Sequence, residues 1–296
     1  MNSAGSEPAL IGLDWGTSSF RAYLIGADGG VISSVAAPEG ILHVEGGNFE
    51  AAFGRLVGPW AAEHNVPVIA SGMITSRNGW VETPYVGLPS GAAELAAAMT
   101  THTLANGRKI HFVTGMTAET SGAPDVMRGE ETQIAGAVAA GGGSGVFVLP
   151  GTHSKWVAVE EGKITSFATF MTGDVFGAMR GHTILGALMD EGEGSGAALL
   201  RGAQASRDGG LGLLHSLFTA RTLPLFGEIT KSEAADYLSG LLIGAEVQGA
   251  RALAGDHGQV VLIGRGDLNT RYAQVLEVFG LKAVEAGDHI VARGHF

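Results

Sequence analysis

Residues 13–21 of the chain read LDWGTSSFR, and this stretch decides the fold that we expect. It starts in an apolar run, passes through a polar turn and returns into a segment of alternating residues, which is typical of two strands joined by a tight turn. An Asp-Gly-Gly sequence at 28–30 then indicates a hairpin. The sequence therefore predicts three consecutive antiparallel strands, at Leu10–Trp15, Phe20–Ile25 and Val31–Ala36.

The same order of elements recurs near the middle of the chain. Its first turn is Gly151-Thr152-His153-Ser154, which again combines Gly-Thr with a serine, and its second turn is Glu161-Gly162-Lys163. The strands predicted around these turns are Gly145–Leu149, Trp156–Val159 and Ile164–Phe170. An internal repeat of this kind predicts two copies of one structural unit.

Helices and further strands follow each copy. Apolar residues recur at helical spacing in Phe49–Glu63, Ala92–Thr101, Glu130–Ala140, Ser232–Leu253 and Thr270–Phe279. Short apolar runs predict buried strands at Val66–Ser71, Ile110–Thr114 and Val260–Gly264. Because strands that alternate with helices are typical of α/β proteins, we expect two α/β domains with a cleft between them. Glycine and proline break the pattern at 115–125, which predicts domains at residues 1–120 and 121–296.

The composition excludes several classes of function. With 296 residues, 45 % of them hydrophobic, the chain can bury a full core. Its net charge of −11 argues against a nucleic-acid or anionic-membrane surface, since both need clustered Lys and Arg. It has no cysteine for a thiolate metal site, no signal-peptide pattern and no apolar stretch of the roughly 18 residues that a membrane helix needs. We expect a cytoplasmic protein without nucleic-acid or membrane partners, and a homo-oligomer stays open.

The common nucleotide and hydrolase motifs are absent, because the sequence contains no GxxxxGK[ST], no GxGxxG between strand and helix, no HExxH and no GxSxG. What remains is the pair of Gly-Thr turns, whose N–H groups and hydroxyls can hold phosphate oxygens beside a carboxylate that can hold hydrated Mg²⁺. Two such turns on matching hairpins would clamp a polyphosphate. The candidate ligands are Asp14 for the metal, and Gly16, Thr17, Ser18, Gly151, Thr152, His153 and Ser154 for the phosphates.

Six stretches together resemble one family. DWGTSSFRAYLI at 14–25 and LPGTHSKW at 149–156 are similar to the two phosphate loops of the sugar-kinase, Hsp70 and actin superfamily, and IGRGDLNTRYAQVLEVFG at 263–280 is similar to its adenosine loop. Within that superfamily, ASGMITSRNGWVETPYVGLPSG, DVMRGEETQIAGA and TFMTGDVFGAMRGHTILG resemble the 2-dehydro-3-deoxygalactonokinases. The resemblance covers residues 10 to about 280, nearly the whole chain.

The resemblance implies two ribonuclease-H-like domains that close on their ligands, with ATP and Mg²⁺ as cofactors. It implies transfer of the ATP γ-phosphoryl group to the 6-hydroxyl of a sugar acid, 2-dehydro-3-deoxygalactonate. The adenosine loop would place Gly264 and Gly266 against the nucleotide. In this chain Arg265 separates these glycines, whereas the superfamily usually has two or three in a row, and the resemblance still implies the place of the loop.

The residues of the site then receive roles from the chemistry of phosphoryl transfer. Arg21 is expected near the transferring group, and the segment that follows the strand at 66–71 is expected to bind the substrate. There Arg77 would meet the carboxylate of the acid, with Asn78, Trp80 and Tyr85 around the sugar chain. Asp174 either lines the cleft or caps a helix.

The catalytic base is expected at the start of a helix, where related kinases commonly carry an aspartate shortly before the second phosphate turn. This chain has Glu130 and Glu131 there instead, and the spacing from Glu130 to Gly151 fits better. One residue turns a helical side chain by about 100°, so the two cannot face the same hydroxyl. We expect Glu130 to be the base and Glu131 to be the second choice.

Two other functions stay open at this point. A kinase of a neutral or N-acyl amino sugar is one, although the amino-sugar branch commonly carries a cysteine-rich zinc motif that this chain lacks. A non-catalytic sugar sensor is the other, but a DNA-binding sensor would need a helix-turn-helix before the first phosphate strand at residue 10.

Overall fold

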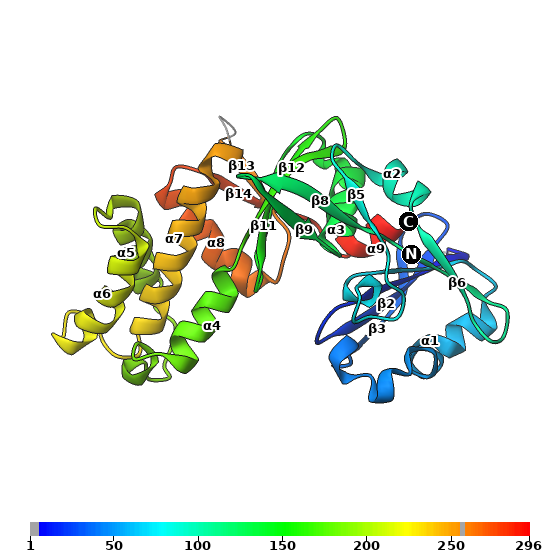
Figure 1. The fold of residues 1–296 in the computed structure, drawn as a ribbon, viewed down its shortest axis with the longest axis horizontal. Helices are drawn as coiled ribbons and strands as arrows, with labels where there is room; N and C mark the ends of the chain where they lie inside the picture. Colours follow the sequence, from blue (N-terminus) through cyan, green and yellow to red (C-terminus); the bar gives the residue numbers. More distant parts are fainter. Residues whose placement is uncertain (1–5, 255–257) are drawn as a thin grey trace, which may run out of the picture. The chain divides into compact units, whose positions relative to one another are not determined.

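Two sheets, each opened by three consecutive strands, organise the protein (Figure 1). The structure is a computed structural model that describes residues 6–254 and 258–296. Its contacts divide the chain into two units. The first unit comprises Met1–Ser144, Val159–Ser166 and Gly287–Phe296, and the second comprises Gly145–Ala158 and Phe167–Ala286.

The sheet of the first unit has the strand order β3-β2-β1-β4-β7-β6. Its strands are β1 (Pro8–Trp15), β2 (Phe20–Gly26), β3 (Val31–Ala37), β4 (Val68–Ser71), β6 (Thr100–Thr103) and β7 (Lys109–Phe112). The strands β1, β2 and β3 pair antiparallel, which confirms the prediction from the opening stretch. The strands β1, β4 and β7 run parallel, so their carboxyl ends meet at one edge of the sheet.

Helices cover both faces of this sheet, and the alternation along β1 decides which residues meet which helix. Ile11, Leu13 and Trp15 pack with helix α1 (Phe49–Glu63). Leu10 lies on the other face and packs with helix α9 (Ile290–His295), which contacts helix α3 (Glu130–Ala137). Figure 1 shows α1 and α9 on opposite sides of the sheet. Asp14 alternates with Leu13 and Trp15 and therefore lies on the α3 and α9 side.

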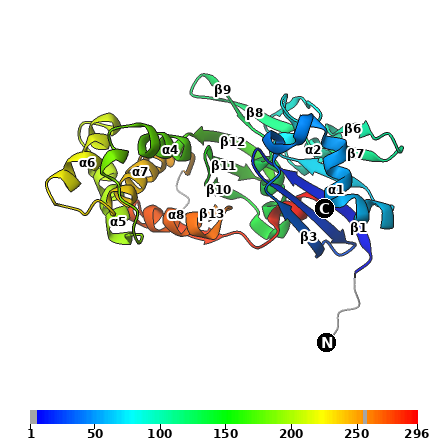
Figure 2. The same ribbon diagram turned by 90° about the horizontal axis from the view of Figure 1, so that it is seen from below.

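The second sheet has the order β12-β11-β10-β13-β14, and Figure 2 shows β10, β11 and β12 side by side. Its strands are β10 (Gly145–Leu149), β11 (Ser154–Glu160), β12 (Lys163–Phe170), β13 (Gln259–Leu262) and β14 (Lys282–Glu285). Here β10, β13 and β14 run parallel. In both sheets the first three strands stand in reverse order, and the first of them pairs with a later parallel strand. The predicted internal repeat and the α/β class are thus confirmed.

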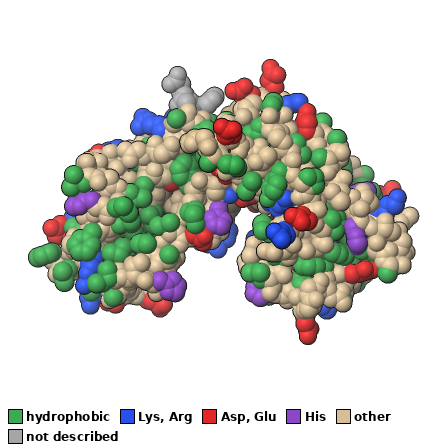
Figure 3. All heavy atoms as spheres, viewed as in Figure 1, with side chains coloured by type: hydrophobic (Ala, Val, Ile, Leu, Met, Phe, Trp, Pro, Cys, Tyr) green, Lys and Arg blue, Asp and Glu red, His purple; other side chains and the backbone are tan. Residues whose placement is uncertain are grey.

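The α-helices of the second unit are α4 (Thr172–His182), α5 (Gly196–Asp208), α6 (Leu213–Leu225), α7 (Ala234–Ala254) and α8 (Gly266–Val278). Helices α5, α7 and α8 pack on the sheet around the fully buried Trp156 and Tyr272. The outer side of α6 exposes large apolar side chains, of which Leu214 is 87 % exposed, and Figure 3 shows hydrophobic side chains gathered there. Among the described residues, we find no helix whose length and hydropathy would suffice to cross a membrane.

Two predictions about the first unit need correction. The helix predicted at 92–101 is shorter, because α2 (Ala92–Ala97) ends before the β-branched threonines of β6, which pair antiparallel with β7. The segment predicted to hold the domain boundary, 115–125, instead forms a hairpin of β8 (Gly115–Thr120) and β9 (Ala123–Met127) inside the first unit, beside β5 (Tyr85–Gly87). Its turn residues Ser121 and Gly122 have φ of 53° and 78°, the backbone of a two-residue hairpin turn.

Candidate active site

Asp14 stands at the end of β1, where the parallel strands of the first sheet present their carboxyl ends. It pairs with Arg21 on β2 and with Ser71 on β4. Its Oδ2 lies 3.6 Å from Nη1 of Arg21, and its side chain is 18 % exposed. Burial raises the pKa of Asp14, the Arg21 guanidinium lowers this pKa and the neighbouring Glu130 carboxylate raises it. The charged form of Asp14 would therefore gain from a bound cation.

Two glycines let the beginning of α3 approach this strand end. Gly72, directly after β4, has φ 93°, and a Cβ there would lie 2.9 Å from the carbonyl oxygen of Trp15. Gly129, directly before α3, has φ 109°, and a Cβ there would lie 3.1 Å from Cα of Gly72. Both positions need a backbone that larger residues rarely adopt, and both lack room for a side chain. This close packing brings the first turn of α3 to the end of β1.

The two glutamates of that turn have different environments. The Glu130 side chain is half-buried, and its carboxylate accepts a hydrogen bond from the Arg128 N–H at 2.9 Å. Glu131 is only 1 % exposed and accepts hydrogen bonds from the Gly129 N–H at 2.7 Å and from Thr132 Oγ1 at 3.1 Å. Burial, with a smaller contribution from the Glu130 charge, raises the pKa of Glu131 to about 7. Glu130 is thus the more accessible of the pair and interacts with Asp14.

The first Gly-Thr turn, predicted to bind phosphate, is held in place by hydrogen bonds of its backbone. The Gly16 N–H donates to the Ser19 carbonyl at 2.9 Å, and the carbonyls of Gly16 and Thr17 accept from the chain at 41–42. The side chains of Thr17 and Ser18 are exposed. The residues whose hydroxyls the sequence proposes as phosphate ligands are therefore accessible to a ligand.

The segment after β4 carries the predicted substrate ligands. A 3₁₀ turn, Met73–Thr75, leads into a loop in which Arg77 and Asn78 are exposed. No hydrogen bond or ion pair joins Arg77 to any residue in the part of the chain that the structure describes. Its charge is therefore available to an anionic ligand.

Trp80 packs against the aromatic core of the first unit and is partly buried. Its ring stacks on Phe49 with centroids 6.1 Å apart and meets Trp15 and Phe112 edge-on at 6.4 and 5.7 Å. Aromatic pairs of this kind contribute about 0.5–1.5 kcal/mol each beyond their burial. Trp80 thus fastens the loop to the core of the first unit, and its contact with a sugar chain stays a prediction. Tyr85, by contrast, is 44 % exposed on β5.

A pocket of about 940 Å³ in the second unit joins the second phosphate turn to the predicted adenosine loop. Its lining includes Gly151, Thr152, Arg265, Asp267 and Tyr272. Because β10 and β13 are parallel neighbours, the segments that follow them lie together, and a Cβ on Gly264 would be 3.5 Å from Pro150 Cδ. Gly264, Arg265 and Gly266 are exposed at this edge.

His153 and Asp174 form an exposed pair beside this pocket. Nε2 of His153 lies 2.7 Å from Oδ2 of Asp174, and the Asp174 N–H donates to the Thr152 carbonyl at 3.1 Å. Asp174 lies in the first turn of α4, whose N-cap is Met171, so the alternative of a helix cap is wrong. Asp174 instead orients His153 against the phosphate turn.

The Ser154 side chain faces the interior and not the pocket. Ser154 is fully buried, and its Oγ lies 2.8 Å from the Tyr272 hydroxyl, which donates to Glu246 at 2.7 Å. Trp156 Nε1 also donates to Glu246, at 2.9 Å. We therefore correct the prediction that the Ser154 hydroxyl holds phosphate, because this hydroxyl belongs to a buried network.

Several residues of the pocket carried no signal in the sequence. Arg271 pairs with the buried Asp236, which also accepts a hydrogen bond from the Ser195 N–H at 2.6 Å. Both Asp236 and Arg271 line the pocket, and they come from α7 and α8. Only the folded chain brings them together, since no motif links positions 35 residues apart.

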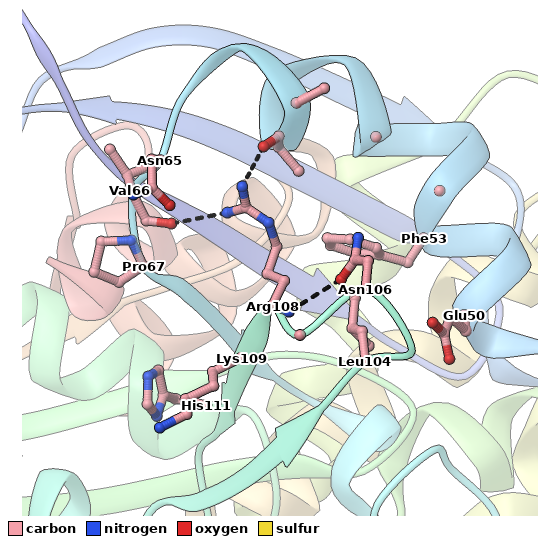
Figure 4. A pocket seen from close by; sticks show the side chains of 15 residues that line it. Glu50, Phe53, Asn65, Val66, Pro67, Leu104, Asn106, Arg108, Lys109 and His111 are labelled. Atoms are coloured by element: carbon pink, nitrogen blue, oxygen red, sulfur yellow. Dashed lines mark hydrogen bonds between the residues drawn. The ribbon is translucent and has the colours of Figure 1, made fainter.

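Another pocket, of about 820 Å³, lies in the first unit between α1 and the turn before β7 (Figure 4). None of the predicted site residues lines it. Arg108 stands in its wall and donates to the carbonyls of Val66 at 3.2 Å and of Ala61. These bonds tie the end of α1 to the start of β4, so the pocket belongs to the framework of the unit.

The carboxylates of the site fit a hydrated magnesium ion better than a metal enclosed by protein ligands alone. Among the residues described, no group of three or more histidine, aspartate or glutamate side chains could enclose a metal. Mg²⁺ is usually held by one or two carboxylates together with phosphates and water. Asp14, at the end of β1, provides one such carboxylate.

Comparison with known proteins finds matches over nearly the whole chain. The sequence profile of the 2-keto-3-deoxy-galactonokinase family matches residues 14–296. A probable 2-dehydro-3-deoxygalactonokinase of Rhizobium meliloti is 36 % identical over 99 % of this chain and 96 % of its own length, and the 2-dehydro-3-deoxygalactonokinase of Escherichia coli is 31 % identical over 94 % and 93 %. A crystal structure from Sinorhizobium meliloti, to which the same activity is ascribed, superposes with a TM-score of 0.89 at 36 % identity, covering 97 % of this chain and 96 % of that one.

The raised pKa of Glu131 predicts how stability depends on pH. Its folded-state pKa of about 7 exceeds the ordinary value of 4.5, so the native state binds more protons than the unfolded state between these values. The free energy of unfolding should therefore fall as pH rises from 4.5 through 7, by roughly 1–3 kcal/mol from this group. Glu131→Gln should lack this fall, as urea unfolding at pH 5 and pH 8 can measure. Parallel pH profiles of the wild type and the variant would contradict the burial of an ionisable Glu131.

Proposed function

Because this chain belongs to the 2-keto-3-deoxy-galactonokinase family, we propose that it transfers the γ-phosphoryl group of ATP to the 6-hydroxyl of 2-dehydro-3-deoxygalactonate. The chain is an ATP-dependent sugar-acid kinase of galactonate catabolism. The products are ADP and 2-dehydro-3-deoxy-6-phosphogalactonate. The observation that carries the proposal is the accessible Glu130 beside Asp14 at the carboxyl end of the first sheet.

Glu130 acts as the general base in this proposal. Phosphoryl transfer to an alcohol needs a carboxylate near the attacking hydroxyl, and Glu130 is the glutamate of the first turn of α3 that a ligand can approach. Glu131 is buried and binds the Gly129 N–H, so it supports the helix start. The geometry thus favours Glu130 over Glu131.

Asp14 serves as the anchor of the metal, and Arg21 neutralises charge next to it. When bound at Asp14, Mg²⁺ would supply positive charge that offsets the charge of the transferring phosphoryl group. Arg21, whose side chain is 51 % exposed, is placed to contact phosphoryl oxygens while its Nη1 remains near Asp14. The hydroxyls of Thr17 and Ser18 would donate to further phosphate oxygens.

The pocket of the second unit is proposed to hold the nucleotide. Gly151 and Thr152 would face phosphates, with His153 oriented by Asp174 as an additional donor. Helix α8 begins at Gly266, so its N-terminal N–H groups stand at the same pocket. The paired Asp236 and Arg271 provide polar groups for the ribose and the base.

Arg77, with Asn78 beside it, is proposed to bind the carboxylate end of the acid. A charge-assisted bond from guanidinium to carboxylate is stronger than a neutral hydrogen bond. Arg77 has no competing carboxylate among the residues described. This cation is therefore what would distinguish an acid substrate from a neutral sugar.

Coupled ADP release with a panel of acceptors tests the function. The panel contains 2-dehydro-3-deoxygalactonate, its C4 epimer, the corresponding neutral hexoses and N-acetylmannosamine. We expect the keto-deoxy acids to be phosphorylated with kcat/KM at least about a hundredfold above that of neutral sugars, since these leave Arg77 unpaired. A neutral sugar that matches the acid would instead support a kinase of another sugar, and ADP release that no acceptor stimulates would contradict a kinase.

The assignment of the base predicts that Glu130→Gln and Glu131→Gln differ in their rate of phosphoryl transfer. Glu130→Gln should lower the rate of phosphoryl transfer by at least about a hundredfold while ATP and the acid still bind, because general-base catalysis contributes about 10²–10⁴-fold. Glu131→Gln, which conserves shape, should keep most of the rate. Single-turnover assays measure both rates directly. The assignment is overturned if Glu130→Gln transfers phosphoryl at the rate of the wild type, or if only Glu131→Gln loses the rate.

Arg77 should govern the binding of the acid and leave that of ATP unchanged. Loss of a charge-assisted hydrogen bond costs about 1.5–3 kcal/mol, which corresponds to roughly ten- to a hundredfold in affinity. Arg77→Ala should raise the KM for the acid by this factor in steady-state assays. The exposed Arg207, bound to Asp208 in the second unit, offers a control whose alanine variant should change neither KM. Equal changes in both KM values for Arg77→Ala would exclude a role in binding the carboxylate.

A further inference from the structure

The loop of residues 76–82, which carries Arg77 and is called the substrate loop below, is closed at its base by the guanidinium of Arg128. Thr75 and Thr83, the first and last residues of this base, are 0 % and 3 % exposed, and the Thr83 N–H donates to the Thr75 carbonyl at 3.0 Å. Nη1 of Arg128 donates to the Thr75 carbonyl and Thr75 Oγ1, both at 2.7 Å, and to Thr83 Oγ1 at 2.6 Å. Nη2 donates to the Thr83 carbonyl at 3.1 Å. One side chain thus holds both ends of the loop.

The loop between these threonines carries the proposed ligands of the acid. Arg77 and Asn78 lie two and three residues beyond Thr75 and are exposed. Trp80 packs into the aromatic core and fastens the middle of the loop. The loop is therefore fixed at its base by Arg128 and at its centre by Trp80, and Arg77 projects from the part between them.

The same residue is connected to the proposed base. Arg128 lies two residues before Glu130, and its N–H donates to Glu130 Oε2 at 2.9 Å. Its guanidinium also lies 4.4 Å from the centre of the Tyr85 ring, which covers it from β5. A displacement of Arg128 would thus change both the loop of Arg77 and the start of α3.

Arg128 is not placed to be a ligand itself. Its Nη1 and Nη2 are committed to the two threonines, and its buried Nε finds no acceptor among the residues that the structure describes. Removing such a group leaves buried threonine acceptors without a donor. A guanidinium enclosed in this way acts through the residues that it holds.

We propose that Arg128 is a positioning residue, which sets the substrate loop of residues 76–82 relative to Glu130. The inference rests on the proposed function, because it takes Arg77 as a ligand of the acid and Glu130 as the base. A misplacement of about 1 Å in a reacting pair can cost a hundredfold in rate. Arg128 should therefore affect the sugar acid and the chemical step, and not the nucleotide.

Arg108 provides a matched control in the same unit. Its guanidinium also binds carbonyls, those of Val66 (Figure 4), His64 and Ala61. Val66 precedes β4, whereas Thr75 follows it. It lines no part of the candidate active site. Loss of either arginine removes several hydrogen bonds to the backbone, so both glutamine variants should be less stable than the wild type.

The experiment compares Arg128→Gln with Arg108→Gln in steady-state and single-turnover assays. We expect Arg128→Gln to lower kcat/KM for 2-dehydro-3-deoxygalactonate by about ten- to a hundredfold, with a higher KM for the acid and an unchanged KM for ATP. Arg108→Gln should unfold at a lower temperature but keep both KM values. The inference is overturned if both variants show the same kinetics, or if Arg128→Gln changes the KM for ATP as much as that for the acid.

A milder pair of variants tests the clamp if Arg128→Gln does not fold. Thr83→Val keeps the shape of the side chain but removes the oxygen that accepts from Nη1, and Thr83→Ser retains this oxygen. The valine variant should show the same selective loss toward the acid, by severalfold, and the serine variant should restore the kinetics of the wild type. Wild-type kinetics in Thr83→Val would refute the clamp.

Amide hydrogen exchange separates this inference from the proposed function. If the wild type phosphorylates none of the keto-deoxy acids, the function is wrong, but the clamp is still judged by the exchange of the Thr83 and Trp80 amides, which donate to Thr75 and Ile74. These amides should exchange at least about tenfold faster in Arg128→Gln, or in Thr83→Val, than in Arg108→Gln. Equal exchange in the variants and the wild type would overturn the inference independently of activity.

Discussion

The approach of the first turn of α3 to the ends of β1 and β4 is the constraint on which the candidate site depends. Gly72 and Gly129 leave so little space between these backbones that a Cβ at either position would lie about 3 Å from its neighbour, at 2.9 and 3.1 Å. The helix is held from behind by α9, since a Cβ on Gly136 would lie 1.9 Å from the Ile290 carbonyl oxygen. A carboxylate on a strand and two carboxylates on a helix thereby meet at one edge of the sheet.

This arrangement gives the two neighbouring glutamates different chemistry. Glu131 is buried, accepts the Gly129 N–H and has a pKa raised to about 7, whereas Glu130 is half-buried and acts on the pKa of Asp14. The buried Glu131 side chain accepts a hydrogen bond at the helix start, while its burial disfavours the charged form. The carboxylate of Glu130 next to it is the more accessible of the two. The proposed general base and a buried glutamate thus stand next to each other within one helical turn.

In the second unit, a glycine in the first turn of a helix likewise allows close packing, here against the second Gly-Thr turn. A Cβ on Gly173, in the first turn of α4, would lie 2.5 Å from the Gly151 carbonyl oxygen, so this helix start is pressed against the second phosphate turn. Beneath the turn, Ser154, Tyr272 and Glu246 form a buried hydrogen-bonded chain that connects β11 with α8 and α7. Burial raises the pKa of Glu246, which favours its neutral form in this network. The phosphate turn is therefore fixed from below, and only Thr152 and His153 remain exposed on it.

The sequence by itself determined the order of the elements and the position of the two Gly-Thr turns. These features depend on local patterns, such as the alternation along residues 20–25 and the glycines of the turns, and the structure agrees with them closely at β1, β2, β10 and α1. Only the tertiary structure decided which side chains are buried and which partners they bind. Ser154 turns inward, Trp80 joins the core and Arg128 binds Thr75 and Thr83, because their partners come from positions far away in the chain, 118 residues away for Ser154. The hairpin at 115–127 is another example, since glycine and proline break a helical pattern equally well in a domain boundary and in a tight turn. A local pattern specifies a backbone conformation, but burial and hydrogen-bond partners depend on contacts between distant segments, which no short stretch of sequence contains.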